Sequence, residues 1–303
     1  MWRLTVRPAA SGPLLGVAGG SYVRAMNDAP TLGITGSTGH IGALVACLLT
    51  DQGLRVRLLA RDVSRTPDLP GALSVPCSYE DTGSSRAALA GVSTLFMVSG
   101  SESADRLDQH RSFIDAAARA GVRHVVYTSF VGAGQDATFT LARDHGATED
   151  HLRARGLTHT VLRDNFYLDF LPSLVGEDGV IRGPAGQGRV AAVARADVAR
   201  VAATVLADPG AHADATYELT GPEALTMDDV AAIISATGRP ARFHDETIEE
   251  AYDSRAAWGA PDWQVDAWVS TYTAIAAGEL ERVTQDVERV TGRRPLSLAE
   301  LVA

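Results

Sequence analysis

Short apolar runs alternate with segments of helical periodicity along most of this chain. From residue 31 onward each run is short enough for a buried strand, and the intervening segments repeat apolar residues about every three or four positions, as amphipathic helices do. Regular alternation of strand and helix is typical of α/β folds with a parallel sheet. The predicted strands lie at 31–35, 56–60, 73–77, 94–98, 125–129, 158–162, 190–193 and 217–219.

Glycines mark the ends of several predicted helices, as expected where a residue in the left-handed region closes a helix. These helices and their glycines are 41–52 with Gly53, 105–120 with Gly121, and a helix from about Leu141 with Gly156. Residues 176–188 are rich in glycine and are predicted to form a loop. The pairs Thr226 with Asp229 and Ser297 with Glu300 have the spacing of capping boxes, which start helices.

No repeat or low-complexity linker divides residues 31–303, so we expect one domain with a smaller lobe. That lobe, over about 222–303, is predicted to be mainly helical and to complete a substrate cleft. Residues 1–30 differ in composition and have no acidic residue before Asp28. We interpret them as a disordered extension, or as the result of an upstream start codon with Met26 as the working start. Their apolar stretch is too short and too broken for a secretory signal.

Composition and charge exclude several classes of function. With 46% hydrophobic and 21% charged residues and no apolar run of bilayer length, the chain is predicted to be a globular protein outside the membrane. A net charge of -10 opposes binding to the phosphates of nucleic acid. Cys47 and Cys77 show neither metal-ligand nor disulfide spacing, which favours a reducing, cytoplasmic location. The scattered histidines form no ligand motif, and no metal is expected.

Lysine is absent, and all 27 basic residues are arginine. Schiff-base chemistry, a lysine general base and a lysine phosphate clamp are therefore excluded. Any phosphate must instead be bound by backbone N–H groups or by arginine.

The most specific motif joins the first predicted strand to the first predicted helix. A glycine triplet in a strand-turn-helix unit allows a tight turn, close approach of backbone to a diphosphate, and close packing of helix on sheet. The helix N-terminus adds a partial positive charge. We therefore predict a dinucleotide site on a Rossmann-type, doubly wound parallel sheet, although similar turns also occur without a ligand. Its residues are Gly36, Ser37, Thr38, Gly39, His40, Ile41 and Gly42.

The end of the second predicted strand indicates which dinucleotide is bound. Arg61 lies where a Rossmann protein reads the adenosine ribose, and its planar guanidinium suits a 2′-phosphate, with Arg65 nearby. This favours NADP(H) over NAD(H). Two alternatives stay open: Arg61 is a solvated surface residue, or Asp62 accepts a hydrogen bond from a ribose hydroxyl.

At these motifs the chain resembles the NmrA-like group of atypical short-chain dehydrogenases/reductases. The resemblance runs from about Thr31 to the C-terminus, and it rests on TGSTGHIG, LLARD, VVYTSF, HGATE, LRDNFYLDFLP and ARADVAR. That group includes NAD(P)H-dependent quinone oxidoreductases and redox-sensing regulators. The resemblance implies that the residues after the fourth and fifth strands border the nicotinamide. These are Ser99, Gly100, Ser129 and Phe130.

The chain departs from the family at the catalytic pair. The Tyr-x-x-x-Lys pair of the main short-chain dehydrogenases cannot exist without lysine, and quinone reductase relatives carry a His-x-x-x-Glu-Lys segment that here ends in Asp150. His145 and Glu149 are four residues apart on one predicted helix, so they share a face. His145 is a candidate proton donor or substrate ligand and Glu149 its orienter. The alternative is a surface His-Glu pair of little consequence.

The candidate substrate contacts follow the sixth predicted strand. Asn165, Phe166 and Tyr167 follow the sixth strand, at the sheet edge where α/β proteins bind ligands. Aromatic residues of the C-terminal lobe are interpreted as core rather than cleft. They are Trp258, Trp263, Trp268 and Tyr272.

The leading hypothesis is an NADP(H)-dependent oxidoreductase that transfers a hydride to a small organic acceptor. A quinone fits best, because hydride addition gives a weakly basic anion that water can protonate, so the site needs positioning more than a tuned acid. The alternative is a non-catalytic NAD(P)-binding redox sensor that acts through a protein partner. The sequence leaves open whether the protein forms a homodimer.

Overall fold

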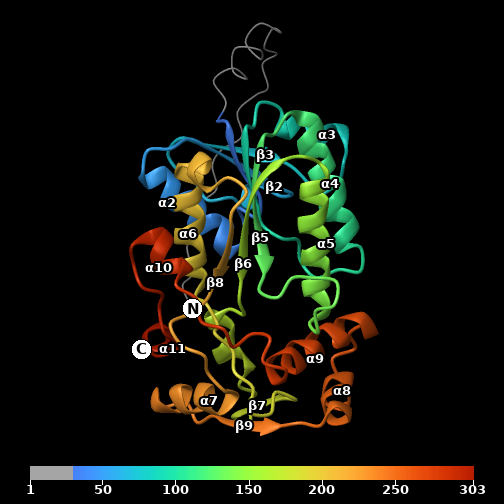
Figure 1. Ribbon diagram of the computed structural model, residues 1–303, viewed down its shortest axis with the longest axis vertical. Coiled ribbons are helices and arrows are strands. Elements are labelled where there is room, and N and C mark those ends of the chain that lie inside the picture. The colour runs from blue at the N-terminus through green and yellow to red at the C-terminus, as the bar shows by residue number, and fades with distance from the viewer. Residues whose placement is uncertain (1–29) are drawn as a thin grey trace, which may run out of the picture.

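The computed structural model describes residues 30–303, which are built on a seven-stranded sheet (Figure 1). Its order is β3-β2-β1-β4-β5-β6-β8, and every neighbouring pair is parallel. The order reverses between β1 and β4, and such reversals open a crevice at the carboxyl ends of the strands. The predicted Rossmann-type fold is confirmed. The strands are β1 (Leu32–Ile34), β2 (Val56–Ala60), β3 (Ala72–Pro76), β4 (Thr94–Met97), β5 (His124–Phe130), β6 (Thr158–Asp164) and β8 (Thr216–Leu219).

Helices cover both faces of this sheet (Figure 1). On one face α2 (His40–Asp51) packs against α6 (Arg195–Ala207). The other face carries α3 (Gly83–Leu89), α4 (Arg106–Ala120) and α5 (Thr140–Ala154).

Each face has its own apolar core. Because successive residues of a strand point to opposite faces, Phe96 enters the core under α2 and α6, and Met97 enters the core under α3 to α5. Both side chains are fully buried. The crossover helices are therefore fixed on both sides of the strand ends that form the site.

A second group of elements lies beyond the carboxyl ends of the strands (Figure 1). There β7 (Val180–Gly183) and β9 (Arg242–Asp245) form a parallel pair, and a third apolar core joins them to α7 (Met227–Ala236), α9 (Asp262–Ala276) and α11 (Leu298–Val302). Of the other helices of the C-terminal third, α8 (Ile248–Ala256) packs against α9 and α10 (Asp286–Thr291) packs against α6. The short 3-10 helices are η1 (Val63–Arg65), η2 (Leu168–Leu174) and η3 (Pro209–His212).

Most predicted elements are observed within a few residues of their expected bounds. Gly53, Gly121 and Gly156 all have positive φ, and both predicted capping boxes form, at Thr226 and at Ser297. The C-terminal third is mainly helical, as expected, apart from β9.

Two predicted segments are wrong. The apolar run at 190–193 forms only isolated bridges, Val190 with Leu225 and Tyr167 with Val193. Its residues are buried, but burial of an apolar run does not by itself require a ladder of strand pairs. The expected loop at 176–188 contains β7, where Gly183 is required because a Cβ there would lie 2.4 Å from the Tyr272 ring. This glycine marks close packing rather than a loop.

The expected disordered extension falls, apart from residue 30, outside the described residues. Within residues 30–303, no helix has both the length and the apolar character that a membrane span requires.

Candidate functional site

The glycine loop between β1 and α2 brings bare backbone to the crevice of the sheet. Gly36 has φ +60, and its carbonyl accepts a hydrogen bond from Gly39 N at 2.9 Å. A Cβ on Gly42 would lie 2.4 Å from the Gly36 carbonyl oxygen, so only glycine allows α2 to approach the loop this closely. Ser37 Oγ donates to Leu59 O at 3.3 Å and ties the loop to β2.

The N-terminus of α2 is open to an anion. The helix has no side-chain cap and no acidic residue in its first turn. Its first internal bond runs from Ala43 N to Gly39 O, so the N–H groups of His40, Ile41 and Gly42 have no partner among the described residues. Gly39 and His40 are exposed. Unpaired N–H groups at the positive end of a helix dipole form an anion site.

At the end of β2, Arg61 and Asp62 differ in whether their side chains already have hydrogen-bond partners within the protein. Asp62 Oδ1 accepts hydrogen bonds from Ser64 N at 3.0 Å and Ser64 Oγ at 2.6 Å, and so caps η1. These Ser64 hydrogen bonds lower the pKa of Asp62. Arg61 is exposed and makes no hydrogen bond or ion pair with any described residue. The side chain free for a ligand is therefore Arg61.

Side chains from α4, from β5 and from the connections after β1 and β3 hold the segment after β4, residues 98–100. Thr35 Oγ1 accepts from Val98 N at 2.9 Å, Thr128 Oγ1 accepts from Ser99 N at 2.8 Å, and His110 Nε2 accepts from Gly100 N at 2.8 Å. The Val98 carbonyl accepts from Tyr79 Oη, and the Gly100 carbonyl accepts from Arg106 Nε at 3.0 Å. Ser99 and Gly100, which the resemblance places at the nicotinamide, thus lie on a fixed backbone.

Behind this segment lies a buried polar group that we call the Arg106 cluster, formed by Arg106 and His110 of α4, Tyr127 of β5, and Asp144 and His145 of α5. Arg106 is 3% exposed and donates from Nη2 to His145 Nε2 at 2.8 Å and from Nη1 to Asp144 Oδ2 at 3.4 Å. Since guanidinium can only donate, His145 Nε2 is an acceptor, and its proton lies on Nδ1, 2.8 Å from Tyr127 Oη.

This geometry does not favour His145 as a proton donor. Burial, the Arg106 charge and His110 together lower the pKa of His145 well below its ordinary value. Burial likewise lowers the pKa of His110 to about 3. Both imidazoles are therefore neutral at physiological pH, and the only N–H of His145 is directed at Tyr127.

Glu149 is not placed to orient His145, because its hydrogen bonds go elsewhere. The carboxylate, 1% exposed, accepts from Ser129 Oγ at 2.7 Å, from Arg163 at 2.8 Å and from Arg153 at 3.0 Å. Burial alone would raise the pKa of Glu149, but the hydrogen bonds from Arg163 and Ser129 outweigh it and lower that pKa. Glu149 is an anchor between α5, β5 and β6.

At the end of β5, Ser129 and Phe130 point to different surroundings. Ser129 Oγ is directed at Glu149, so its hydroxyl proton is not free for a ligand. Phe130 is half-buried and packs against Phe139 at 4.9 Å between ring centroids, with the His145 ring at 6.3 Å.

The residues after β6 mostly bond to the protein itself. Asn165 Nδ2 donates to Leu280 O at 3.0 Å, and Asn165 Oδ1 accepts from Phe166 N at 2.7 Å. Tyr167 Oη donates to Asp164 Oδ2 at 2.8 Å. Asn165 therefore joins the C-terminal third to the sheet edge, and Phe166, which is half-buried, is left as the residue of this group whose side chain makes no polar contact.

Asp164 is a buried acid at the end of β6. It is 1% exposed, and its Oδ1 has no hydrogen-bond partner. Burial raises the pKa of Asp164 to about 8, despite the hydrogen bond from Tyr167. The carboxyl group is therefore largely protonated at neutral pH.

The aromatic residues of the C-terminal third divide between core and surface. Tyr272 is buried, as expected for a core residue, but Trp258 is 65% exposed. Trp258 lies edge-on to Trp268 at 5.4 Å, and Trp268 Nε1 donates to Glu102 at 3.3 Å. Glu102 belongs to the loop after β4, so α9 contacts that loop directly.

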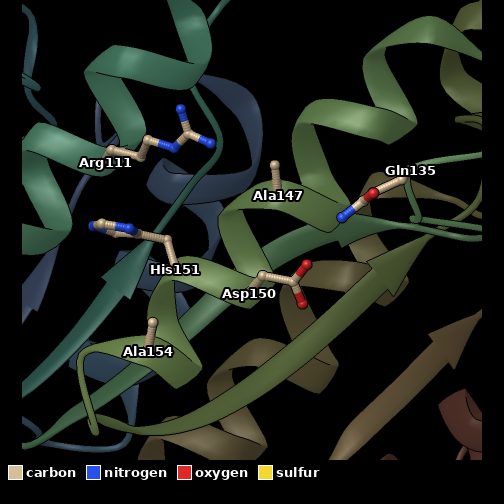
Figure 2. Close-up of a pocket in the computed structure, with 6 residues that line it drawn as sticks. All are labelled: Arg111, Gln135, Ala147, Asp150, His151 and Ala154. Atoms are coloured by element: carbon tan, nitrogen blue, oxygen red, sulfur yellow. The ribbon is translucent and has the colours of Figure 1, made fainter.

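A pocket of about 330 Å³ lies between α4, α5 and the loop after β5 (Figure 2). None of its residues is a predicted site residue. It is lined by Arg111, Gln135, Ala147, Asp150, His151 and Ala154.

Sequence reasoning missed the side chains that hold the 98–100 segment. Arg106 and His110 lie on a predicted helix, and Tyr79 lies in a connection. No short motif distinguishes such residues from surface positions, since what brings them together is the packing of α4 and α5 on the sheet. The absence of lysine was the one available signal, because it required any cation in the site to be arginine.

Comparisons with known proteins agree with this geometry. A family model described as NAD(P)H-binding matches residues 36–209. The NAD(P)H azoreductase of Xenophilus azovorans is 32% identical over 274 residues, which cover 88% of this chain and 95% of the relative.

Solved structures share the fold over most of the chain. The NADPH-dependent quinone oxidoreductase of Escherichia coli, in complex with NADPH, superposes with a TM-score of 0.80 at 29% identity, covering 89% of this chain and 98% of the other. The negative transcriptional regulator NmrA superposes with a TM-score of 0.70 at 17% identity over 90% of this chain and 94% of the other, which shows the fold alone.

Proposed function

The chain belongs to the NAD(P)H-binding family and is an NAD(P)H-dependent oxidoreductase, and from this premise we propose that it uses NADPH to reduce a planar, quinone-like acceptor. The observation that carries the proposal is the glycine loop at the N-terminus of α2, together with Arg61 at the end of β2, whose side chain has no partner among the described residues. The first feature suits a diphosphate and the second suits a 2′-phosphate.

The residues present fit the dinucleotide. A Cβ on Gly42 would fill the contact between loop and helix, and α2 presents three N–H groups without partners among the described residues. The N–H groups from His40 to Gly42 would hold the diphosphate, and Arg61 the 2′-phosphate. The fixed 98–100 segment, with Phe130, would border the nicotinamide. When bound, NADPH supplies a hydride.

The preference for NADPH rests on the contrast between Arg61 and its neighbour. An acidic side chain at this position would favour NADH by accepting hydrogen bonds from the ribose. Asp62 is adjacent, but its Oδ1 is held by Ser64. The guanidinium of Arg61 is left to face a ligand at the strand end.

The acceptor class follows from the proton donors that the chain offers. His145 is neutral, and its N–H is directed at Tyr127, while Ser129 donates to Glu149. A simple ketone needs a strong acid to protonate the developing alkoxide, but a reduced quinone is a weakly basic anion that water can protonate. The names of the two relatives, an azoreductase and a quinone oxidoreductase, are consistent with this class.

The chain's own residues thus act by positioning. Backbone N–H groups bind the diphosphate, and Arg61 distinguishes NADPH from NADH. The side chains around residues 98–100 keep one wall of the site rigid, which favours a reactive arrangement of cofactor and acceptor.

A panel assay tests the proposal. Purified protein is mixed with NADPH and, in turn, with benzoquinones, naphthoquinones, azo dyes and simple ketones, and the loss of NADPH absorbance is followed. We expect turnover with the quinones and none with the ketones. No turnover with any acceptor, combined with different affinities for NADPH and NADP⁺, would instead support the redox-sensing alternative, because a sensor needs differential binding.

A further inference from the structure

Arg106 connects the segment expected to meet the cofactor with the interior of the α4–α5 layer. Its Nε–H donates to the Gly100 carbonyl at 3.0 Å, and its Nη2 donates to His145 at 2.8 Å. Asp144, at 3.4 Å and 26% exposed, is the acidic partner of this guanidinium. A 3% exposed cation with one distant, partly solvated counter-ion is costly to bury, so a packing role alone does not explain it.

The hydrogen bonds of Arg106 fix two other groups. Through Gly100 O it holds the backbone of residues 98–100 from the same side as His110, which accepts from Gly100 N at 2.8 Å. Through Nη2 it makes His145 Nε2 an acceptor, and this leaves Nδ1–H to donate to Tyr127 Oη. A side chain without a hydrogen-bond donor in place of Arg106 would set neither preference.

We propose that Arg106 is a positioning residue that fixes the 98–100 segment and holds His145 in its Nδ1–H tautomer. The guanidinium is thus a buried positive charge beside this segment in a chain that has no lysine. That the ligand at this segment is the nicotinamide half of NADPH rests on the proposed function. The contacts of Arg106 are independent of that function.

The charges around His145 give the expected direction of the effect. Arg106 and His110 face it from α4, Tyr127 faces it from β5, and Asp144 precedes it on α5. Glu149, one turn further along α5, is already bonded to Arg163 and Ser129. Loss of the Arg106 charge removes a repulsion against the imidazolium, so the pKa of His145 should rise only in part, because burial, the largest cause of its lowering, remains. The tautomer of His145 should no longer be fixed.

The first test is NMR of the full chain without cofactor, labelled at the histidine nitrogens. The His145 signals are assigned by their loss in His145→Gln. In the unmodified protein we expect one Nδ1–H tautomer that does not titrate between about pH 5 and 8. In Arg106→Met, which keeps an unbranched side chain but has no donor, we expect signals of a second, Nε2–H tautomer of His145. Arg111→Met, on the exposed side of the same helix, is the matched control and should change nothing at His145.

The second test separates charge from geometry. Arg106→Lys keeps the charge but replaces the planar fork by a single compact donor group. It should leave His145 neutral while weakening NADPH binding by about 10-fold, the effect of losing one hydrogen bond from a charged donor. The affinity is measured by calorimetry. The variant also serves if Arg106→Met does not fold.

The outcomes separate this inference from the proposed function. Unchanged His145 signals in Arg106→Met, or equal changes in Arg111→Met, would overturn the role of Arg106 whether or not the protein reduces quinones. The same conclusion would follow if Arg106→Lys bound NADPH as tightly as the unmodified protein. Failure of the quinone assay with these NMR results intact would remove only the proposed acceptor.

Discussion

The glycine loop and the Arg106 cluster lie along the same edge of the sheet but are made of different parts of the chain. The loop is one continuous stretch, residues 36–42, and its key feature is that Gly36, Gly39 and Gly42 carry no side chain. The cluster consists of side chains from α4, β5 and α5, and its key feature is a buried cation among neutral imidazoles. Backbone sites leave a motif in the sequence, whereas side-chain clusters do so only where their spacing is local.

The largest effect is expected when a side chain is added at one of the glycines of the loop. Gly42→Ala places a Cβ 2.4 Å from the Gly36 carbonyl oxygen, so α2 must move away from the loop. Overpacking of this kind costs about 3 kcal/mol, and we expect roughly 100-fold weaker NADPH binding by calorimetry. Gly83→Ala is the control, because a Cβ there meets nothing within 4 Å. Equal affinities of the two variants would contradict the close contact.

Among the buried side chains of α5, the largest effect on stability is expected at Glu149. Glu149→Gln removes a charge that is 1% exposed while Arg163 and Arg153 stay in place, and we expect the free energy of unfolding to fall by about 2 kcal/mol in urea. Asp150→Asn removes an exposed partner of the same Arg153 and should change the free energy of unfolding by less than about 0.5 kcal/mol. Similar losses in both variants would argue against a buried anchor.

The next prediction concerns Arg61, beside the glycine loop, and the relative affinities for NADPH and NADH. Arg61→Asp should weaken NADPH by about 10-fold and leave NADH nearly unchanged, because an exposed arginine reads the 2′-phosphate through charge-assisted bonds that water and salt screen. Titration of the variant with both cofactors checks it. Equal losses for NADPH and NADH would show that Arg61 does not read the phosphate.

The last prediction concerns how the stability of the fold depends on pH through Asp164. With a folded pKa of about 8, Asp164 keeps its proton while the unfolded chain releases it above its ordinary value of 3.8. The folded state binds the proton more tightly, so stability falls as pH rises from about 4 to 8 and levels off above. Compared with the unmodified protein, Asp164→Asn should be less stable at pH 4, because its amide leaves one buried group unpaired. The difference should shift in favour of the variant as pH rises to 8, by at most about 1.4 kcal/mol per pH unit, because the variant has no proton to retain. Urea unfolding at both pH values measures this, and a pH-independent difference would be evidence against a titrating Asp164.

Much of the fold and half of the site could be predicted from the sequence. Strand-helix alternation and helix-ending glycines located the sheet, and the loop motif with Arg61 located the features that suit a dinucleotide. The run at 190–193 was misassigned because it is buried without joining a ladder, and β7 was missed because Gly183 packs against Tyr272. The pairing of Glu149 with His145 followed from helical spacing, but the stronger cations Arg163 and Arg153 take the carboxylate.

The central claim is that unpaired N–H groups at the start of α2 hold the diphosphate of a nicotinamide nucleotide. Calorimetric titration with NADPH, NADP⁺, NADH and NAD⁺ tests it most directly. We predict measurable binding, strongest for the phosphorylated forms and greatly weakened in Gly42→Ala. Absence of binding heat with all four nucleotides over a range of temperatures would contradict the account.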